Sequence, residues 1–182
     1  MEDHQLIQKV MNGDHKAYLN LIEKYQLLVV HMVGRVVSDD LDKEELCQDV
    51  FMKVYESLGS FKGTSKLSTW IATIGYRMAV NFAKKKNRRQ EPEELDDVAF
   101  KVGQLDERYE DEDFNRFIRE IIDQMPESYR VVLTLFYLDG FSYPEIVEIT
   151  GKPEGTVKNY LFRARQKLKE LAEPYVGTEI EI

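Results

Sequence analysis

The sequence has little cysteine, no long apolar run and few strand signals, and each of these absences excludes a class of protein. A single cysteine, Cys47, rules out an internal disulfide and a cysteine-rich zinc site. The longest uncharged stretches, between Lys24 and Arg35 and between Lys66 and Arg77, hold ten residues each, whereas a membrane span needs roughly 20. The N-terminus lacks the basic start, apolar run and small-residue cleavage site of a secretion signal. We therefore expect a chain that works in the reducing cytoplasm and does not insert into membranes.

The residue patterns of common catalytic sites are also missing. The sequence has no glycine-rich phosphate loop, no nucleophile elbow and no thiol pair. Its histidines have no metal-like spacing with carboxylates; they are His4, His15 and His31. We therefore expect no catalytic residue, no metal and no cofactor, and we do not expect an enzyme.

The net charge of −8 conceals an uneven distribution along the chain. Residues 1–90 carry 14 basic and 11 acidic side chains, residues 91–113 carry 2 and 11, and residues 114–182 carry 9 and 11. The middle segment has a strong acidic bias and no sustained apolar period, which predicts a flexible linker. Because local charge decides affinity for nucleic acid, the basic clusters on either side of this segment remain compatible with DNA binding.

Apolar residues at helical spacing predict a four-helix bundle before residue 90. The helices are expected at about 4–12, 14–37 and 42–58, with a fourth from Leu67 that ends in the basic run 84–89. Asp14 is the predicted N-cap of the second helix. The third helix carries apolar residues among its charges, namely Leu46, Val50, Met52, Val54 and Leu58.

The helical pattern returns at Phe114 and predicts a second domain. Its helices are expected to end near Met125, to include Val131 to Phe136, and to span about 142–149 and about 154–172. The last residues, 174–182, form a short tail. We therefore expect an all-α protein with two small helical domains, residues 1–90 and 114–173, joined by a flexible acidic linker at 91–113.

The second domain contains the pattern of a helix-turn-helix, in which a short helix, a turn with Gly151 and a second helix follow one another. Ile146 and Ile149 are expected to face Val157 and Leu161, which leaves the front of the second helix free to enter a major groove. The side chains at the start of that front suit contacts with base edges, and the cations that follow them suit contacts with phosphates. Those expected to contact duplex DNA are Thr156, Lys158, Asn159, Phe162, Arg163 and Arg165.

These motifs resemble those of the extracytoplasmic-function sigma factors of bacterial RNA polymerase. Residues 125–133, 138–143, 155–158 and 161–165 are similar to the fourth conserved region of that family, and residues 44–51, 61–63 and 68–81 to its second region. The resemblance covers about residues 5–172. It implies a sigma region 2 bundle and a sigma region 4 helix-turn-helix domain that recognises the −35 promoter element.

The same resemblance implies a function and a set of partners. The chain is expected to direct core RNA polymerase to specific promoters and to promote −10 melting, in response to an envelope or stress signal. Its implied partners are core RNA polymerase, promoter DNA and an anti-sigma factor.

The third helix is expected to bind the polymerase. Glu45, Gln48 and Asp49 fall at positions i, i+3 and i+4, so they share one face of this helix. A carboxylate-rich patch suits a basic partner surface, and the resemblance implies that this surface is the clamp helices of core polymerase.

The loop around Phe61 and the fourth helix are expected to hold the melted −10 DNA. Single-stranded DNA is bound by stacking on aromatic side chains and by cations that follow its backbone. Phe61 and Asn81 occupy family positions that line a pocket for a flipped base. The expected contacts are Phe61, Lys62, Lys66, Arg77, Asn81, Lys84, Lys85 and Arg88. Trp70 has the spacing of a core residue and is expected in the core instead.

Three positions depart from the family pattern. Phe136 stands where some relatives have an arginine that reaches DNA, so one phosphate contact is expected to be missing. Val147 replaces a small residue between the two helices of the helix-turn-helix. Cys47 replaces the commoner alanine and is expected to act as a small buried hydrophobe.

Two other functions stay open on the sequence alone. A helix-turn-helix repressor or a response-regulator output domain would account for residues 114–172 and leave the N-terminal features without a purpose. An adaptor that binds only proteins would leave the two cation clusters unexplained. Dependence on core polymerase distinguishes these alternatives from a sigma factor.

Overall fold

The computed structural model describes residues 3–89, 120–122 and 124–176. The linker expected at 91–113 and the tail beyond residue 176 lie outside these ranges. The described helices form two compact units. Every regular element in the described ranges is helical, as the all-α prediction requires.

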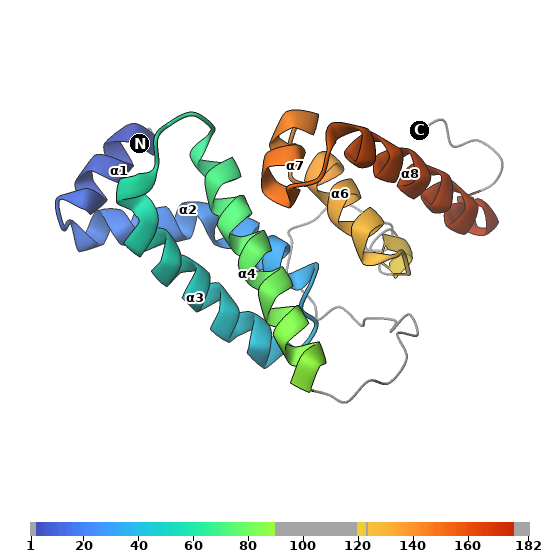
Figure 1. The fold of residues 1–182 in the computed structure, drawn as a ribbon, viewed down its shortest axis with the longest axis horizontal. Coiled ribbons are helices and arrows are strands. Elements are labelled where there is room, and N and C mark those ends of the chain that lie inside the picture. The colour runs from blue at the N-terminus through green and yellow to red at the C-terminus, as the bar shows by residue number, and fades with distance from the viewer. Residues whose placement is uncertain (1–2, 90–119, 123, 177–182) are drawn as a thin grey trace. The chain divides into compact units, whose positions relative to one another are not determined.

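The N-terminal unit contains the four predicted helices and one short 3-10 turn (Figure 1). They are α1 (Asp3–Met11), α2 (His15–Gly34), α3 (Asp40–Ser57), η1 (Leu58–Ser60) and α4 (Leu67–Arg89). Asp14 caps α2 as predicted, because its carboxylate accepts hydrogen bonds from the N–H groups of Lys16 and Ala17 at 2.9 and 3.0 Å. Asp39 caps α3 in the same way through the N–H of Asp42, at 3.0 Å.

Helix α2 ends at Gly34, three residues before the predicted end at Val37. Val36 and Val37 are nevertheless buried, and their N–H groups both bond to the carbonyl of Val33 as the chain leaves the helix. Their apolar character therefore reflects burial in the core and not helical conformation.

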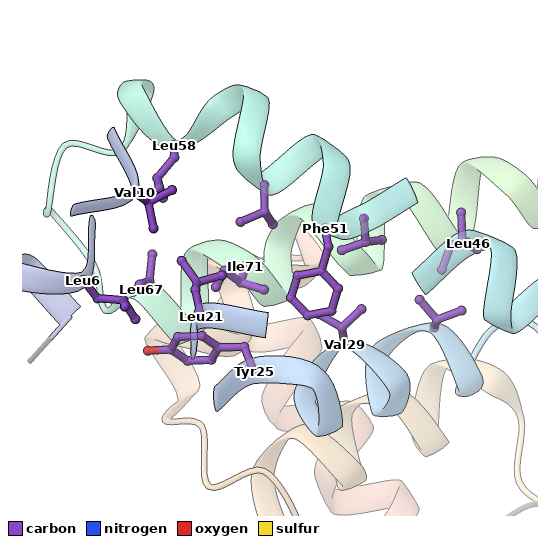
Figure 2. Packing of buried hydrophobic residues seen from close by; sticks show 14 of the residues in the cluster. Leu6, Val10, Leu21, Tyr25, Val29, Leu46, Phe51, Leu58, Leu67 and Ile71 are labelled. Carbon is purple, nitrogen blue, oxygen red and sulfur yellow. The ribbon is translucent and has the colours of Figure 1, made fainter. Parts of the chain in front are cut away.

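The core of this unit lies where α2, α3 and α4 pack against one another. Figure 2 shows Leu21 and Val29 of α2 among Phe51 of α3 and Ile71 of α4. Leu21, Val29 and Ile71 are wholly buried, and burial of such a side chain contributes about 1.5–3 kcal/mol. This shared core fixes the outward faces of α3 and α4 relative to each other.

The C-terminal unit contains α6 (Glu127–Tyr137), α7 (Tyr143–Thr150) and α8 (Glu154–Val176). Of the helix predicted between Phe114 and Met125, the structure describes residues 120–122, which are helical, and residues 124 and 125, which lie in a turn. Helix α8 continues past its predicted end at residue 172 and includes Pro174.

The helix-turn-helix of this unit is formed by α7 and α8. The Glu145 carboxylate accepts hydrogen bonds from the N–H and the hydroxyl of Ser142, at 2.8 and 2.6 Å, which organises the start of α7. Gly151 ends α7 in the left-handed region, with φ of +67°. The residues predicted to pack between the two helices are all fully buried; they are Ile146, Ile149, Val157 and Leu161.

Candidate polymerase and nucleic-acid interfaces

The outward face of α3 carries the three residues predicted to bind a basic partner. Glu45, Gln48 and Asp49 are all exposed. Helical spacing places them beside Leu41 and Met52, whose exposed fractions are 79% and 62%. We call these five residues the docking face; it combines two large apolar side chains with two carboxylates and one amide.

Met52 does not lie with the buried apolar residues of α3, contrary to its place in the sequence pattern. Leu46, Val50 and Val54 recur at every fourth position and are buried, whereas Met52 falls on the opposite side of the helix. The sequence alone could have placed Leu41 on the docking face, because Glu45 follows it at i+4 and residues at that spacing share one face of a helix.

Cys47 is half-buried and packs against the core, in keeping with its predicted role as a small hydrophobe. Burial raises the pKa of its thiol to about 11, although nearby Lys43 acts in the opposite direction. The thiol is therefore protonated at neutral pH and is a poor nucleophile.

Phe61 lies at the end of η1 and packs against Trp70 near the start of α4. The two ring centroids are 5.4 Å apart with an interplanar angle of 57°. Both rings are half-buried and pack against the core, so Trp70 has the structural role that the sequence predicts. Lys62 and Lys66 are exposed in the loop between η1 and α4.

One face of α4 carries several of the residues predicted to contact −10 DNA. Arg77, Asn81 and Lys84 are exposed at i, i+4 and i+7, and Trp70 lies seven residues before Arg77 on the same face. We call these four residues the α4 stripe. Lys85 is exposed beside it, and Arg88 lies in the last turn, where the side chains are outside the described set.

Phe61 and Asn81, the two side chains predicted to line a base pocket, lie on different elements, one after η1 and the other in α4. Phe61 contacts Trp70, and Asn81 lies 11 residues farther along α4. At a rise of 1.5 Å per residue, that is about 16 Å along the helix axis. That Phe61 and Asn81 line one pocket for a flipped base stays a prediction.

Lys86 faces away from the α4 stripe. Its ammonium forms an ion pair with the carboxylate of Asp42 on α3, at 2.5 Å, and this hydrogen bond raises the pKa of the lysine. The basic run at the end of α4 is thus divided between a structural contact with α3 and cations that face solvent.

The front of α8 exposes most of the residues predicted to read duplex DNA. Lys158, Asn159, Phe162 and Arg163 are exposed, whereas Thr156 and Arg165 are half-buried. The Lys158 ammonium forms an ion pair with Glu154 at 2.6 Å, and the hydrogen bond in this pair raises the pKa of Lys158.

Three aromatic residues of α6 and α7 pack together, and two of them, Tyr137 and Tyr143, contact Arg165. We call Phe136, Tyr137 and Tyr143 the aromatic cluster. The ring centroid of Phe136 is 5.0 Å from that of Tyr137 and 5.2 Å from that of Tyr143. Arg165 donates a hydrogen bond from Nη2 to the Tyr143 hydroxyl at 3.3 Å, and its guanidinium carbon lies 5.8 Å from the Tyr137 ring centroid.

Within the described ranges, no three His, Cys, Asp or Glu side chains are grouped so that they could hold a metal ion. No helix in the same ranges is long and apolar enough to cross a membrane.

Two family descriptions match the chain, one for each unit. Sigma-70 region 2 matches residues 21–89, and Sigma-70, region 4 matches residues 118–168. The first match includes α3 and α4 with their exposed faces, and the second includes α6, α7 and most of α8.

Full-length relatives and solved structures agree with these matches. The RNA polymerase sigma-H factor of Pseudomonas aeruginosa is 31% identical, with 95% of each chain covered. The ECF RNA polymerase sigma-E factor of Escherichia coli strain K12 is also 31% identical, with 97% of each chain covered. The sigma factor RpoE of Bartonella quintana has a similar fold, with a TM-score of 0.70 at 24% identity over 87% of this chain and 99% of that one. The chain therefore belongs to the extracytoplasmic-function group of the sigma-70 family, the factors that direct RNA polymerase to promoters to initiate transcription.

Proposed function

We propose that this sigma factor divides promoter recognition among three surfaces. The docking face of α3 binds core RNA polymerase. The loop around Phe61 and the α4 stripe hold the melted −10 element, and the front of α8 reads the −35 duplex. The observation that carries this proposal is the docking face, because a repressor that bound DNA alone would have no use for it.

The composition of the docking face supports a stable protein contact. Leu41 and Met52 expose large apolar side chains that would be desolvated in a complex, and such residues commonly supply binding free energy at the centre of an interface. Glu45 and Asp49 add negative charge beside them, which favours a basic partner and orients its approach. The clamp helices of core polymerase are the partner that the family membership supplies.

The α4 stripe supports contact with an extended single strand. Trp70 and Lys84 are 14 residues apart, which corresponds to about 21 Å along the helix axis and to several nucleotides. The Phe61 and Trp70 rings lie at one end, where a base can stack. Arg77 and Lys84 then offer cations to successive phosphates, with the amide of Asn81 between them.

The front of α8 supports contact with duplex DNA in the major groove. Asn159 and Arg163 carry the amide and guanidinium groups that bond adenine and guanine edges, and Phe162 can contact a thymine methyl group. The buried side chains between α7 and α8 leave this front unobstructed within the unit.

An anti-sigma protein is the regulator that we propose for this chain. RpoE of Bartonella quintana was solved in complex with the anti-sigma factor NepR, and CnrH, whose TM-score is 0.65 at 17% identity, in complex with the cytosolic domain of CnrY. Release from such a protein by an envelope or stress signal would free the chain to bind core polymerase in the cytoplasm.

Run-off transcription with core polymerase on a pool of promoters tests the proposal. The variant Glu45→Ala/Gln48→Ala/Asp49→Lys is expected to lower core binding by roughly a hundredfold or more, because like charges placed together in an interface cost several kcal/mol. The fold is expected to survive, since exposed substitutions change stability by about 0.5 kcal/mol or less. Circular dichroism checks the fold, and a pull-down measures core binding.

Glu23→Lys is the matched control, because it reverses an exposed charge on α2 outside the docking face. It is expected to bind core polymerase and to initiate normally. A folded triple variant that also binds core and initiates normally would contradict the proposal. The repressor alternative forecasts DNA binding that depends on neither the polymerase nor this face.

A further inference from the structure

Tyr143 lies in α7 and contacts side chains of both α6 and α8. It begins α7, its ring packs against Phe136 of α6 at 5.2 Å, and its hydroxyl accepts a hydrogen bond from Arg165 of α8 at 3.3 Å. The ammonium of Lys158, also on α8, lies 5.9 Å from the Tyr143 ring centroid. A single half-buried side chain thus contacts two of the cations predicted to bind DNA.

Those two cations lie on the same edge of α8. Lys158 and Arg165 are seven residues apart, which places them on one side of the helix and about 10 Å apart along its axis. Asn159 and Arg163 lie farther round the exposed front. The edge beside α7 is therefore suited to backbone phosphates, and the rest of the front is suited to base edges.

Arg165 and Lys158 differ in how their charges are compensated. Lys158 is paired with Glu154 at 2.6 Å. Among the described residues no carboxylate forms an ion pair with Arg165, and its Nε atom is buried without a hydrogen-bond partner. The contacts of its guanidinium are instead the Tyr143 hydroxyl and the Tyr137 ring, both of them neutral groups. Its orientation is thus fixed while its positive charge stays available for an anion.

We propose that Tyr143 is a positioning residue that holds Arg165 against a backbone phosphate of the −35 duplex. This inference rests on the proposed role of α8 in DNA binding. Arginine loses much side-chain freedom when it binds, so an orientation set in advance by Tyr143 lowers the cost of the phosphate contact. Phe136 keeps the ring of Tyr143 in place, and the hydroxyl oxygen of Tyr143 accepts the hydrogen bond from Arg165.

Binding of promoter DNA to the holoenzyme, measured across salt concentrations, tests the proposal. Tyr143→Phe keeps the ring and removes the hydroxyl, and it is expected to weaken binding about fivefold, the range of one lost hydrogen bond. The loss is expected on all −35 sequences alike, because a phosphate contact carries no base preference. Arg165→Ala is expected to reduce the slope of log affinity against log salt by about one.

The double variant separates positioning from a general effect on the fold. In the Arg165→Ala background, Tyr143→Phe is expected to cause no further loss, because the side chain that it positions is gone. Tyr160→Phe is the matched control: it is a half-buried tyrosine of the same unit that packs against Tyr129 with a centroid distance of 5.5 Å. It is expected to leave affinity and salt dependence unchanged.

The possible results distinguish this proposal from the proposed function. If Asn159→Ala, Arg163→Ala and Arg165→Ala all leave promoter binding unchanged, α8 does not enter DNA and both proposals fail. If those variants weaken binding but Tyr143→Phe has no effect, or costs the same with and without Arg165, the positioning role alone is overturned.

Discussion

At the scale of single residues, helical periodicity predicts which side faces the core more reliably than it predicts what an exposed side chain does. Met52 is apolar but exposed, because it lies opposite Val50 on α3. Lys86 belongs to a basic run but pairs with Asp42, because it lies opposite the α4 stripe. Both placements follow from the rotation of about 100° per residue, which a count of charges or apolar residues in a run ignores.

The predicted roles of Phe61 and Asn81 lead to an expectation about promoter opening. Phe61→Ala is expected to cost about 1–3 kcal/mol of open-complex stability through lost stacking, and Asn81→Ala a smaller amount. Because both side chains are predicted to line one base pocket, their effects are expected to be non-additive in the double variant. Permanganate reactivity of the −10 region, measured over a range of polymerase concentrations, reports the fraction of open complex.

A matched pair of substitutions makes this prediction specific. Trp70→Phe, which alters the ring that Phe61 contacts, is expected to be non-additive with Phe61→Ala. Additive effects of Phe61→Ala and Asn81→Ala would show that the two side chains do not hold the same base.

At the scale of elements, the sequence predicts those features that depend on neighbouring residues along the chain. The cap at Asp14 and the turn at Gly151 were predictable because a side-chain oxygen or a missing Cβ acts within a few residues. The end of α2 was not, because Val36 and Val37 continue the apolar pattern after the helix has ended. The aromatic cluster was also missed, since its members come from two helices and two of them contact Arg165 of a third.

The turn between α7 and α8 gives a prediction at this scale. Gly151 has φ of +67° and no atom within 4 Å of where a Cβ would lie, so a substitution there acts through backbone strain alone. Gly151→Ala is expected to destabilise the C-terminal unit by about 1–2 kcal/mol, and Gly151→Asn by less, because asparagine tolerates the left-handed region better. Thermal or urea unfolding of the whole chain measures both.

Gly155 provides the control for this prediction. It lies in the first turn of α8, also has no atom within 4 Å of the place that a Cβ would occupy, and has no positive φ. Gly155→Ala is therefore expected to be neutral or to stabilise by up to about 1 kcal/mol, because alanine favours the helix. If Gly151→Ala and Gly155→Ala destabilised the unit equally, the positive φ of Gly151 would not explain the loss. Both methyl groups would then have to clash with a group outside the unit.

At the scale of the whole molecule, an acidic protein carries two surfaces that we propose bind DNA, and the distribution of its charge explains how both are possible. The acidic excess is concentrated in residues 91–113, which carry 11 acidic and 2 basic side chains and lie outside the described ranges. We expect this segment to act through its net charge, by lowering the affinity of the free chain for DNA that is not a promoter. The order of its residues should then matter little.

Two variants of residues 91–113 test this expectation. One scrambles the segment and keeps its composition; the other replaces its 11 acidic residues by Asn or Gln and changes the net charge of the chain from −8 to +3. The scrambled chain is expected to transcribe normally. The neutralised chain is expected to bind non-promoter duplex roughly tenfold more tightly at low salt, with the difference shrinking at high salt as the charges are screened.

Fluorescence anisotropy with a promoter duplex and a random duplex, each at several salt concentrations, gives both affinities for every variant. Because the neutralised chain gains affinity for any DNA, its preference for the promoter is expected to fall while its −35 contacts on α8 stay intact. If the scrambled chain loses activity as severely as a chain without the segment, then the order of residues 91–113 carries information that their charge does not. In that case the segment contacts a partner through particular side chains, and its acidity alone does not explain its role.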